Sequence, residues 1–174
     1  MGALLSLPPV RRRLGERAQR ALTQERSLLF VCLGNICRSP FAEAVARQHL
    51  PPDRRIASSG FWPQPGRSTP AAGIASAWGW DVDLNPHRSS VLDAAAVEQA
   101  GAVFVFDYEN YRRLRREHPG ARGRVHLLGA LGRHGPLLVA SVGVVDERRF
   151  DVTYGHIAEA ISAAWASPRP PTRS

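Results

Sequence analysis

The chain has 174 residues, enough for one compact domain, with 44% hydrophobic and 22% charged residues, the usual balance of a globular protein. No apolar run approaches the ~18 residues that span a bilayer, so we expect no stable membrane anchor. The net charge is +8 and every basic side chain among Lys and Arg is arginine, which favours anionic partners. Because no nucleic-acid recognition motif or stacking aromatics accompany the arginines, we expect a solvated basic surface and no nucleic-acid partner.

Residues 1–26 form an arginine-rich, acidic-poor segment that precedes the first apolar strand pattern. The segment loosely matches a targeting peptide, and it fits an N-myristoylation pattern at Gly2. Four apolar residues stand at helical spacing instead: Leu14, Ala18, Ala21 and Leu22. This spacing favours an amphipathic, non-catalytic helical extension.

From residue 27 onward, short apolar runs alternate with helical patterns, which is typical of α/β architecture. Strands are predicted at 27–32, 54–58, 102–106 and 124–128. Helices are predicted at 38–50, about 70–79, about 91–99, 108–117 and about 151–165. We expect one domain over residues 27–166 and a flexible tail over 167–174.

The two cysteines, Cys32 and Cys37, both lie in one ten-residue stretch. This is the opposite of a spread-out disulfide framework, so the natural setting is a reducing cytoplasm. Free cysteines are often simply small buried residues. A C-x5-R spacing alone would favour that interpretation, and only the surrounding pattern changes it.

That pattern is a buried strand ending in Cys32, a five-residue loop, and a helix opened by Arg38 and Ser39, with Ser39 expected at the helix cap. Loop amides and the positive end of a helix dipole can converge on a tetrahedral oxyanion, and Gly34 permits the tight path. The predicted phosphate-binding residues are Leu33, Gly34, Asn35, Ile36, Cys37, Arg38 and Ser39.

Three side chains in and beside this loop have predicted chemical roles. Arg38 can grip two phosphate oxygens with its planar fork. A thiolate is the reactive form of cysteine, and the amides, the helix dipole and Arg38 favour it. Ser39 can donate a hydrogen bond to the sulfur. Cys32 is therefore the candidate nucleophile.

The segment CLGNICRSPFAEAV resembles the phosphate loop and first helix of the low-molecular-weight protein-tyrosine phosphatases. The resemblance continues over residues 27–166 through IASSG, NPHRSS and AGAVFVFDYENYRRL. It implies a small four-stranded parallel sheet flanked by helices, with flavodoxin-like layering. It also implies an enzyme that hydrolyses phosphotyrosine through a phosphocysteine on Cys32, without a metal or another cofactor.

The resemblance places a general acid, usually an Asp followed by Pro, in the loop before the last helix. Asp146 matches best, although Glu147 replaces the Pro. The competing candidate, Asp151, stands where a cap for the last helix is expected. We therefore favour Asp146 as the acid that protonates the leaving oxygen.

The resemblance also implies polar side chains that brace the loop: Asn35, Ser39, Ser58 and His87. Phe61 and Trp62 are predicted to wall the pocket, although core packing explains them almost as well. Cys37 is a candidate to trap oxidised Cys32 as a disulfide.

Two alternative functions differ from a phosphatase. A phosphotyrosine-binding protein with lost turnover would keep the loop but not need an acid. An arsenate reductase of the same fold needs a further cysteine pair outside the loop, and this sequence has none. By analogy with bacterial relatives, the expected partner is a phosphotyrosine protein, and the candidate is a tyrosine kinase that regulates exopolysaccharide production.

Overall fold

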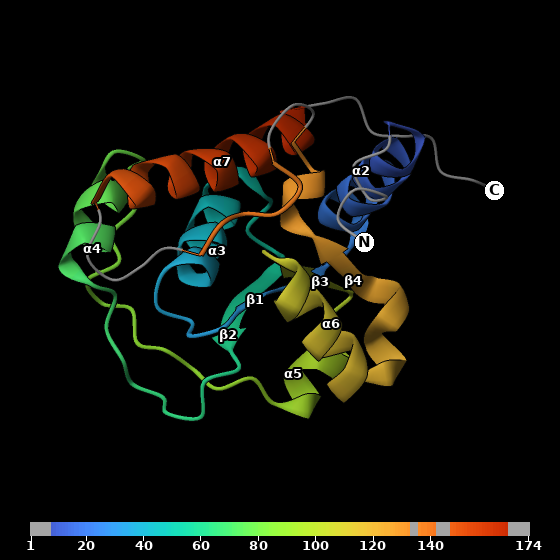
Figure 1. Ribbon diagram of the computed structural model, residues 1–174, viewed down its shortest axis with the longest axis horizontal. Helices are drawn as coiled ribbons and strands as arrows, with labels where there is room; N and C mark the ends of the chain where they lie inside the picture. The colour runs from blue at the N-terminus through green and yellow to red at the C-terminus, as the bar shows by residue number, and fades with distance from the viewer. Residues whose placement is uncertain (1–7, 133–135, 142–146, 167–174) are drawn as a thin grey trace.

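The structure is a computed structural model that describes residues 8–132, 136–141 and 147–166. Its centre is a four-stranded, entirely parallel sheet with the strand order β2-β1-β3-β4 (Figure 1). The strands are β1 (Ser27–Cys32), β2 (Arg55–Gly60), β3 (Ala102–Val105) and β4 (Val125–Leu127). The predicted fold class is confirmed.

Helices cover both faces of the sheet. They are α2 (Pro8–Gln24), α3 (Arg38–His49), α4 (Ala71–Trp78), α5 (Ala94–Gln99), α6 (Tyr108–Glu117) and α7 (Glu147–Ala166), with the 3-10 helices η1 (Pro119–Arg124) and η2 (Leu128–Ala130). Figure 1 shows α3 and α7 on one side of the sheet and α5 and α6 on the other. Helix α4 packs against α7.

The inner strands β1 and β3 are continuous apolar runs because both of their faces are buried. Phe30 and Phe104 lie side by side on these strands, with ring centroids 5.6 Å apart. All four strands run in the same direction, so their carboxyl ends meet at one edge. The segments that follow Cys32, Gly60 and Val105 therefore converge there, where open α/β sheets bind ligands.

Two expected helix caps were wrong. Helix α7 begins at Glu147, so Asp151 lies within its second turn and accepts a 2.6 Å hydrogen bond from the Ser76 hydroxyl of α4 instead of capping the helix. The residue that precedes α3 is Cys37, and Ser39 lies inside the helix. The hydroxyl of Ser39 is thus available for another partner.

Helix α2 packs along α7 and η2, and its buried Ala18 and Leu22 belong to the same core as the sheet. Contact is close at Gly15, where a Cβ would lie only 2.9 Å from the Ala130 carbonyl oxygen. The division of the chain at residue 27 stays a prediction. No helix in the described part of the chain is both long and apolar enough to cross a membrane.

Candidate active site

The loop after β1 wraps around the sulfur of Cys32. Asn35 adopts a left-handed backbone conformation with φ of +50°, which asparagine tolerates better than most residues. This turn directs the Asn35 backbone N–H at Cys32 Sγ, 3.3 Å away. The loop therefore brings one backbone donor, the Asn35 N–H, to the sulfur.

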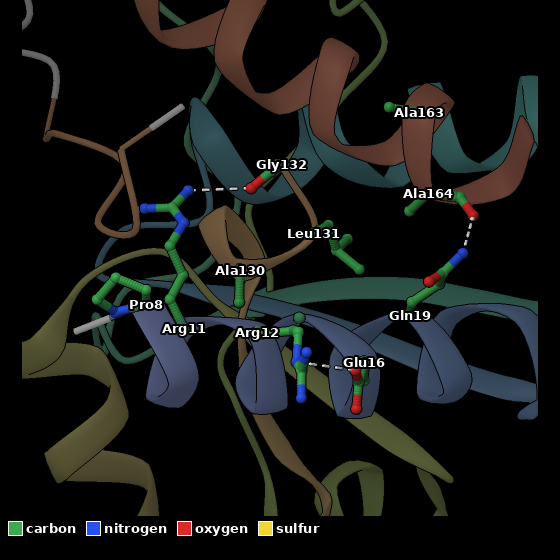
Figure 2. Close-up of a pocket in the computed structure, with 11 residues that line it drawn as sticks. Pro8, Arg11, Arg12, Glu16, Gln19, Ala130, Leu131, Gly132, Ala163 and Ala164 are labelled. Atoms are coloured by element: carbon green, nitrogen blue, oxygen red, sulfur yellow. Dashed lines mark hydrogen bonds and ion pairs between the residues drawn. The ribbon is translucent and has the colours of Figure 1, made fainter. Parts of the chain in front are cut away.

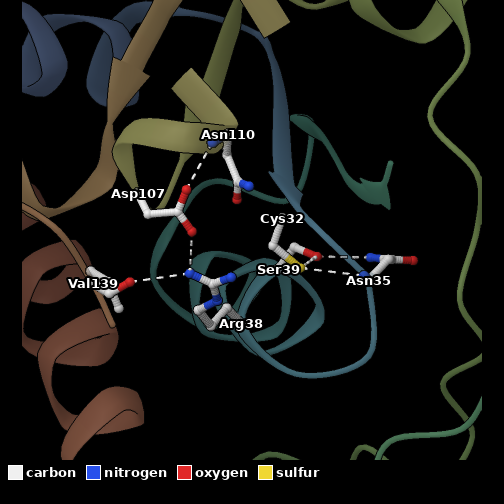
Figure 3. Close-up of polar contacts among 7 residues, drawn as sticks. All are labelled: Cys32, Asn35, Arg38, Ser39, Asp107, Asn110 and Val139. Atoms are coloured by element: carbon white, nitrogen blue, oxygen red, sulfur yellow. Dashed lines mark hydrogen bonds and ion pairs between the residues drawn. The ribbon is translucent and has the colours of Figure 1, made fainter. Parts of the chain in front are cut away.

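The Asn35 side chain organises the hydroxyl groups behind the sulfur. Its Oδ1 accepts the backbone N–H of Ser90 at 2.7 Å, and because that N–H can only donate, the amide orientation is fixed. Nδ2 then donates to the Oγ atoms of Ser39 and Ser58, each at 2.9 Å. With its oxygen accepting from Asn35, the Ser39 hydroxyl has its proton free for Cys32 Sγ, 3.1 Å away (Figure 3).

His87 and Gly60 hold the backbone of the loop. His87 Nε2 lies 2.7 Å from the Asn35 carbonyl oxygen, which only accepts, so Nε2 carries the proton. A Cβ at Gly60 would lie 2.7 Å from the Asn35 backbone nitrogen and 2.8 Å from the Gly34 carbonyl carbon. Only glycine leaves room for the loop at that distance.

Arg38 is 4% exposed and is held from one side. Its Nη1 donates to Asp107 Oδ2 at 2.7 Å and to the Val139 carbonyl oxygen at 3.1 Å (Figure 3). Its guanidinium carbon lies 5.6 Å from the Phe106 ring centroid. Among the described residues both hydrogen bonds use Nη1, so the Nε and Nη2 edge of the fork can bind an anion.

A cavity of about 140 Å³ opens above the sulfur, lined by Cys32, Leu33, Gly34, Ile36, Cys37, Arg38, Trp62, Arg67 and Ser141. The guanidinium of Arg67 lies over the Trp62 ring, 5.1 Å from its centroid. Phe61 instead turns into the core, where Arg113 covers its ring at 4.5 Å. Of the two predicted wall residues, only Trp62 is placed to contact a ligand.

The second cysteine of the loop is buried beside the first, and both are free thiols. Burial, reinforced by the Cys32 charge and opposed by Arg38 and Arg67, raises the pKa of Cys37 to about 12. Burial, followed by the charges of Cys37 and Cys32, also raises the pKa of Tyr154. Cys37 is therefore a protonated thiol at neutral pH.

The two candidate acids have different outcomes. Asp146 lies outside the described residues. Asp151 is occupied by the Ser76 hydroxyl, which ties α4 to α7. Among the described residues, no group of three or more His, Cys, Asp or Glu side chains could hold a metal ion.

Sequence reasoning missed Asp107, Ser90, Gly60 and Arg67. Asp107 had a usable signal, because it directly follows the third strand, at the sheet edge that carries Cys32. There was no such signal for Ser90, because its contact with Asn35 joins residues 55 positions apart. A buried cysteine sulfur within a turn of donors, with a restrained arginine beside it, is a site that can hold a tetrahedral anion next to a nucleophile.

The family model for low molecular weight phosphotyrosine protein phosphatases matches residues 27–135, and the chain belongs to this family. A probable low molecular weight protein-tyrosine-phosphatase, EpsP of Ralstonia nicotianae, is 31% identical over 106 residues, which cover 61% of this chain and 72% of the relative. The predicted family and the predicted class of enzyme, a protein-tyrosine phosphatase, are confirmed.

Solved structures agree. The Erwinia amylovora tyrosine phosphatase AmsI has a TM-score of 0.74 and 28% identity, with 80% of this chain and 91% of that chain covered. Vibrio vulnificus Wzb in complex with benzylphosphonate has a TM-score of 0.72 and 29% identity, with 80% and 96% covered.

Proposed function

We propose that this protein hydrolyses phosphotyrosine through a phosphocysteine intermediate on Cys32. The observation that carries the proposal is the environment of the sulfur. The Asn35 N–H and the Ser39 hydroxyl point at it, and the Arg38 fork is restrained by Asp107 nearby. A sulfur that receives donors is suited to be a thiolate nucleophile and leaving group.

In the first step the Cys32 thiolate attacks phosphorus, an S–P bond forms and the bond from phosphorus to the tyrosine oxygen breaks. The departing phenolate takes a proton from Asp146, the acid proposed from the sequence. Arg38 and the loop amides balance the charge on the phosphoryl oxygens. The tyrosine leaves as a neutral phenol.

In the second step water attacks the phosphocysteine, and the Asp146 carboxylate takes a proton from it. A P–O bond forms, the S–P bond breaks, and inorganic phosphate and the Cys32 thiolate result. The Ser39 hydroxyl stabilises the departing thiolate by donating to it. The Asn35 side chain keeps that hydroxyl in place through both steps.

Trp62 and Arg67 support a preference for phosphotyrosine. Both line the mouth of the cavity, and Trp62 offers a face on which a phenyl ring can stack. The partner we propose is a phosphotyrosine protein in the cytoplasm, with a tyrosine kinase of exopolysaccharide regulation as the candidate by analogy.

Hydrolysis of p-nitrophenyl phosphate, and of phenyl phosphate as a substrate with a poorer leaving group, by the full chain tests the proposal. We expect Cys32→Ser to abolish turnover and Asp146→Asn to lower kcat by ~10²–10⁴-fold for poor leaving groups. Asp151→Asn is the matched control, because that carboxylate is occupied by Ser76, and its kcat should stay near the wild-type value. Full activity of Cys32→Ser would refute the mechanism.

The intermediate can be tested separately. Acid quenching of Asp146→Asn during turnover should yield a phosphorylated peptide that contains Cys32, detected by mass spectrometry. If the protein only binds phosphotyrosine, the wild type should bind an aryl phosphate and release no phosphate.

A further inference from the structure

Helix α2 walls two cavities outside the candidate active site. The larger, of about 480 Å³, lies between α2, η2 and α7 (Figure 2). Its charged side chains already have partners: Arg12 pairs with Glu16 at 3.6 Å, and Arg11 donates to the Gly132 carbonyl oxygen at 3.0 Å. A lining with both signs of charge gives no clear preference for a ligand.

The smaller cavity, of about 220 Å³, lies on the other side of α2 and has a different lining. It is enclosed by α2, α6, β4 and η2, through Leu14, Arg17, Tyr108, Tyr111, Arg115, Val125, His126, Leu127 and Ala130. Two of these nine side chains are guanidinium cations and none is a carboxylate. The other lining residues are apolar or aromatic, so the cavity combines an apolar lining with a net positive charge.

The aromatic walls suit a flat ring. Tyr108 and Tyr111 lie one turn apart on α6, with ring centroids 6.4 Å apart and planes inclined by 20°. The His126 ring, on β4, lines the same cavity and is backed by Phe104, with ring centroids 5.5 Å apart. Burial, and after it the Arg17 charge, lowers the pKa of His126 to about 4, so its imidazole is neutral at pH 7.

The two arginines come from different helices and still have donors to offer. Arg115 uses Nη1 for both the Tyr111 hydroxyl at 2.6 Å and the Arg122 carbonyl oxygen at 3.3 Å. Arg17 uses Nη2 for the Gly123 carbonyl oxygen at 3.3 Å. Each guanidinium has five N–H donors, so each can bind a further acceptor without losing these contacts.

From this lining we propose that the cavity between α2, α6 and β4 binds a small aromatic carboxylate, with Arg17 and Arg115 on the carboxylate and the ring between Tyr108 or Tyr111 and His126. Planar guanidinium groups match a planar carboxylate. The volume is below the ~300 Å³ at which pockets for drug-sized ligands begin, so one ring is the appropriate size.

Benzoate and its neutral isostere benzamide test the site. Each is titrated into the full-length wild-type protein in phosphate buffer, which keeps the Cys32 loop occupied, while ¹H–¹⁵N NMR spectra are recorded. Benzoate should shift the resonances of Tyr108, Tyr111 and His126 saturably. Benzamide should bind at least about 10-fold more weakly, since it lacks the charge that a guanidinium recognises.

Three variants locate the charge. Arg17→Gln and Arg115→Gln should each weaken benzoate binding by about 10-fold to 100-fold, the effect of losing a hydrogen bond to a charged group. Arg116→Gln is the matched control, because Arg116 is exposed on the same helix and does not line the cavity. If Arg115→Gln does not fold, Arg17→Gln decides, since Arg17 is exposed on α2.

Four results would overturn the proposal. One is the absence of a saturable shift at the cavity residues. Another is equal affinity for benzoate and benzamide. The third is wild-type affinity in folded Arg17→Gln and Arg115→Gln. The fourth is the same loss of affinity in Arg116→Gln, which would reduce the effect to net charge.

Discussion

The ion pair between Arg38 and Asp107 gives the sharpest prediction about the site. Asp107 has two roles, one for each carboxylate oxygen. Oδ2 accepts from Arg38 Nη1 at 2.7 Å, and Oδ1 accepts from the Asn110 backbone N–H at 2.8 Å, which caps α6. Asn is as good a cap as Asp. Asp107→Asn therefore removes the charged partner of Arg38 and keeps the helix start.

The expected loss follows from the geometry. The Arg38 side chain is 5% exposed and that of Asp107 is 25% exposed, so solvent screens the pair only in part. A hydrogen bond to a charged group contributes about 1.5–3 kcal/mol, which corresponds to a kcat about 10-fold to 100-fold lower when the fork is no longer held. Asp107→Asn also removes a negative charge near the phosphate site, which favours binding of the phosphate dianion. Inhibition by phosphate should therefore change much less than kcat.

Steady-state hydrolysis of p-nitrophenyl phosphate and competitive inhibition by phosphate measure both quantities. Asp93 offers a matched control, because its Oδ1 caps α5 through the Ala96 N–H at 2.6 Å. Asp93→Asn should leave kcat unchanged. The reasoning is refuted if Asp107→Asn keeps its kcat within two-fold of the wild type, or if Asp93→Asn loses as much.

Three further predictions concern the loop, its second thiol and a buried histidine. Gly60→Ala should lower kcat and reduce the melting temperature by a few degrees, because the new Cβ meets loop backbone at 2.7 Å. Iodoacetate at pH 8 should alkylate Cys32 and spare Cys37, whose pKa is raised to about 12. The pKa of His126 is lowered to about 4 in the folded protein. Between pH 6.5 and 4 the unfolded chain therefore binds more protons at this histidine than the folded chain does. Stability to urea should thus fall by about 2 kcal/mol from pH 6.5 to pH 5.

Each of these has a control. Gly120→Ala places a Cβ in open space and should be neutral for activity. Peptide mass spectrometry measures the alkylation of each cysteine, and equal labelling of the two thiols would contradict the prediction for Cys37. His126→Gln should lose the histidine's share of the pH dependence, and an unchanged slope would show that His126 is not its source.

Local sequence patterns were enough to predict much of the secondary structure. The apolar run of β1 and the charged helical segment Tyr108–Glu117 predicted two elements with their observed bounds. Such elements are determined by neighbours in the sequence, because a short buried run or a helical segment is encoded locally. Cys32 and Arg38 were found for the same reason, since only five loop residues separate them.

The sequence by itself thus determined the α/β class, the family and the loop that carries Cys32. The tertiary structure alone decided what restrains that loop: Asp107 lies 69 residues from Arg38, and Ser90 lies 55 residues from Asn35. Contacts of this kind depend on how the carboxyl ends of parallel strands meet, which no local pattern encodes. The cavity behind α2 likewise exists only because helices distant in sequence pack around β4.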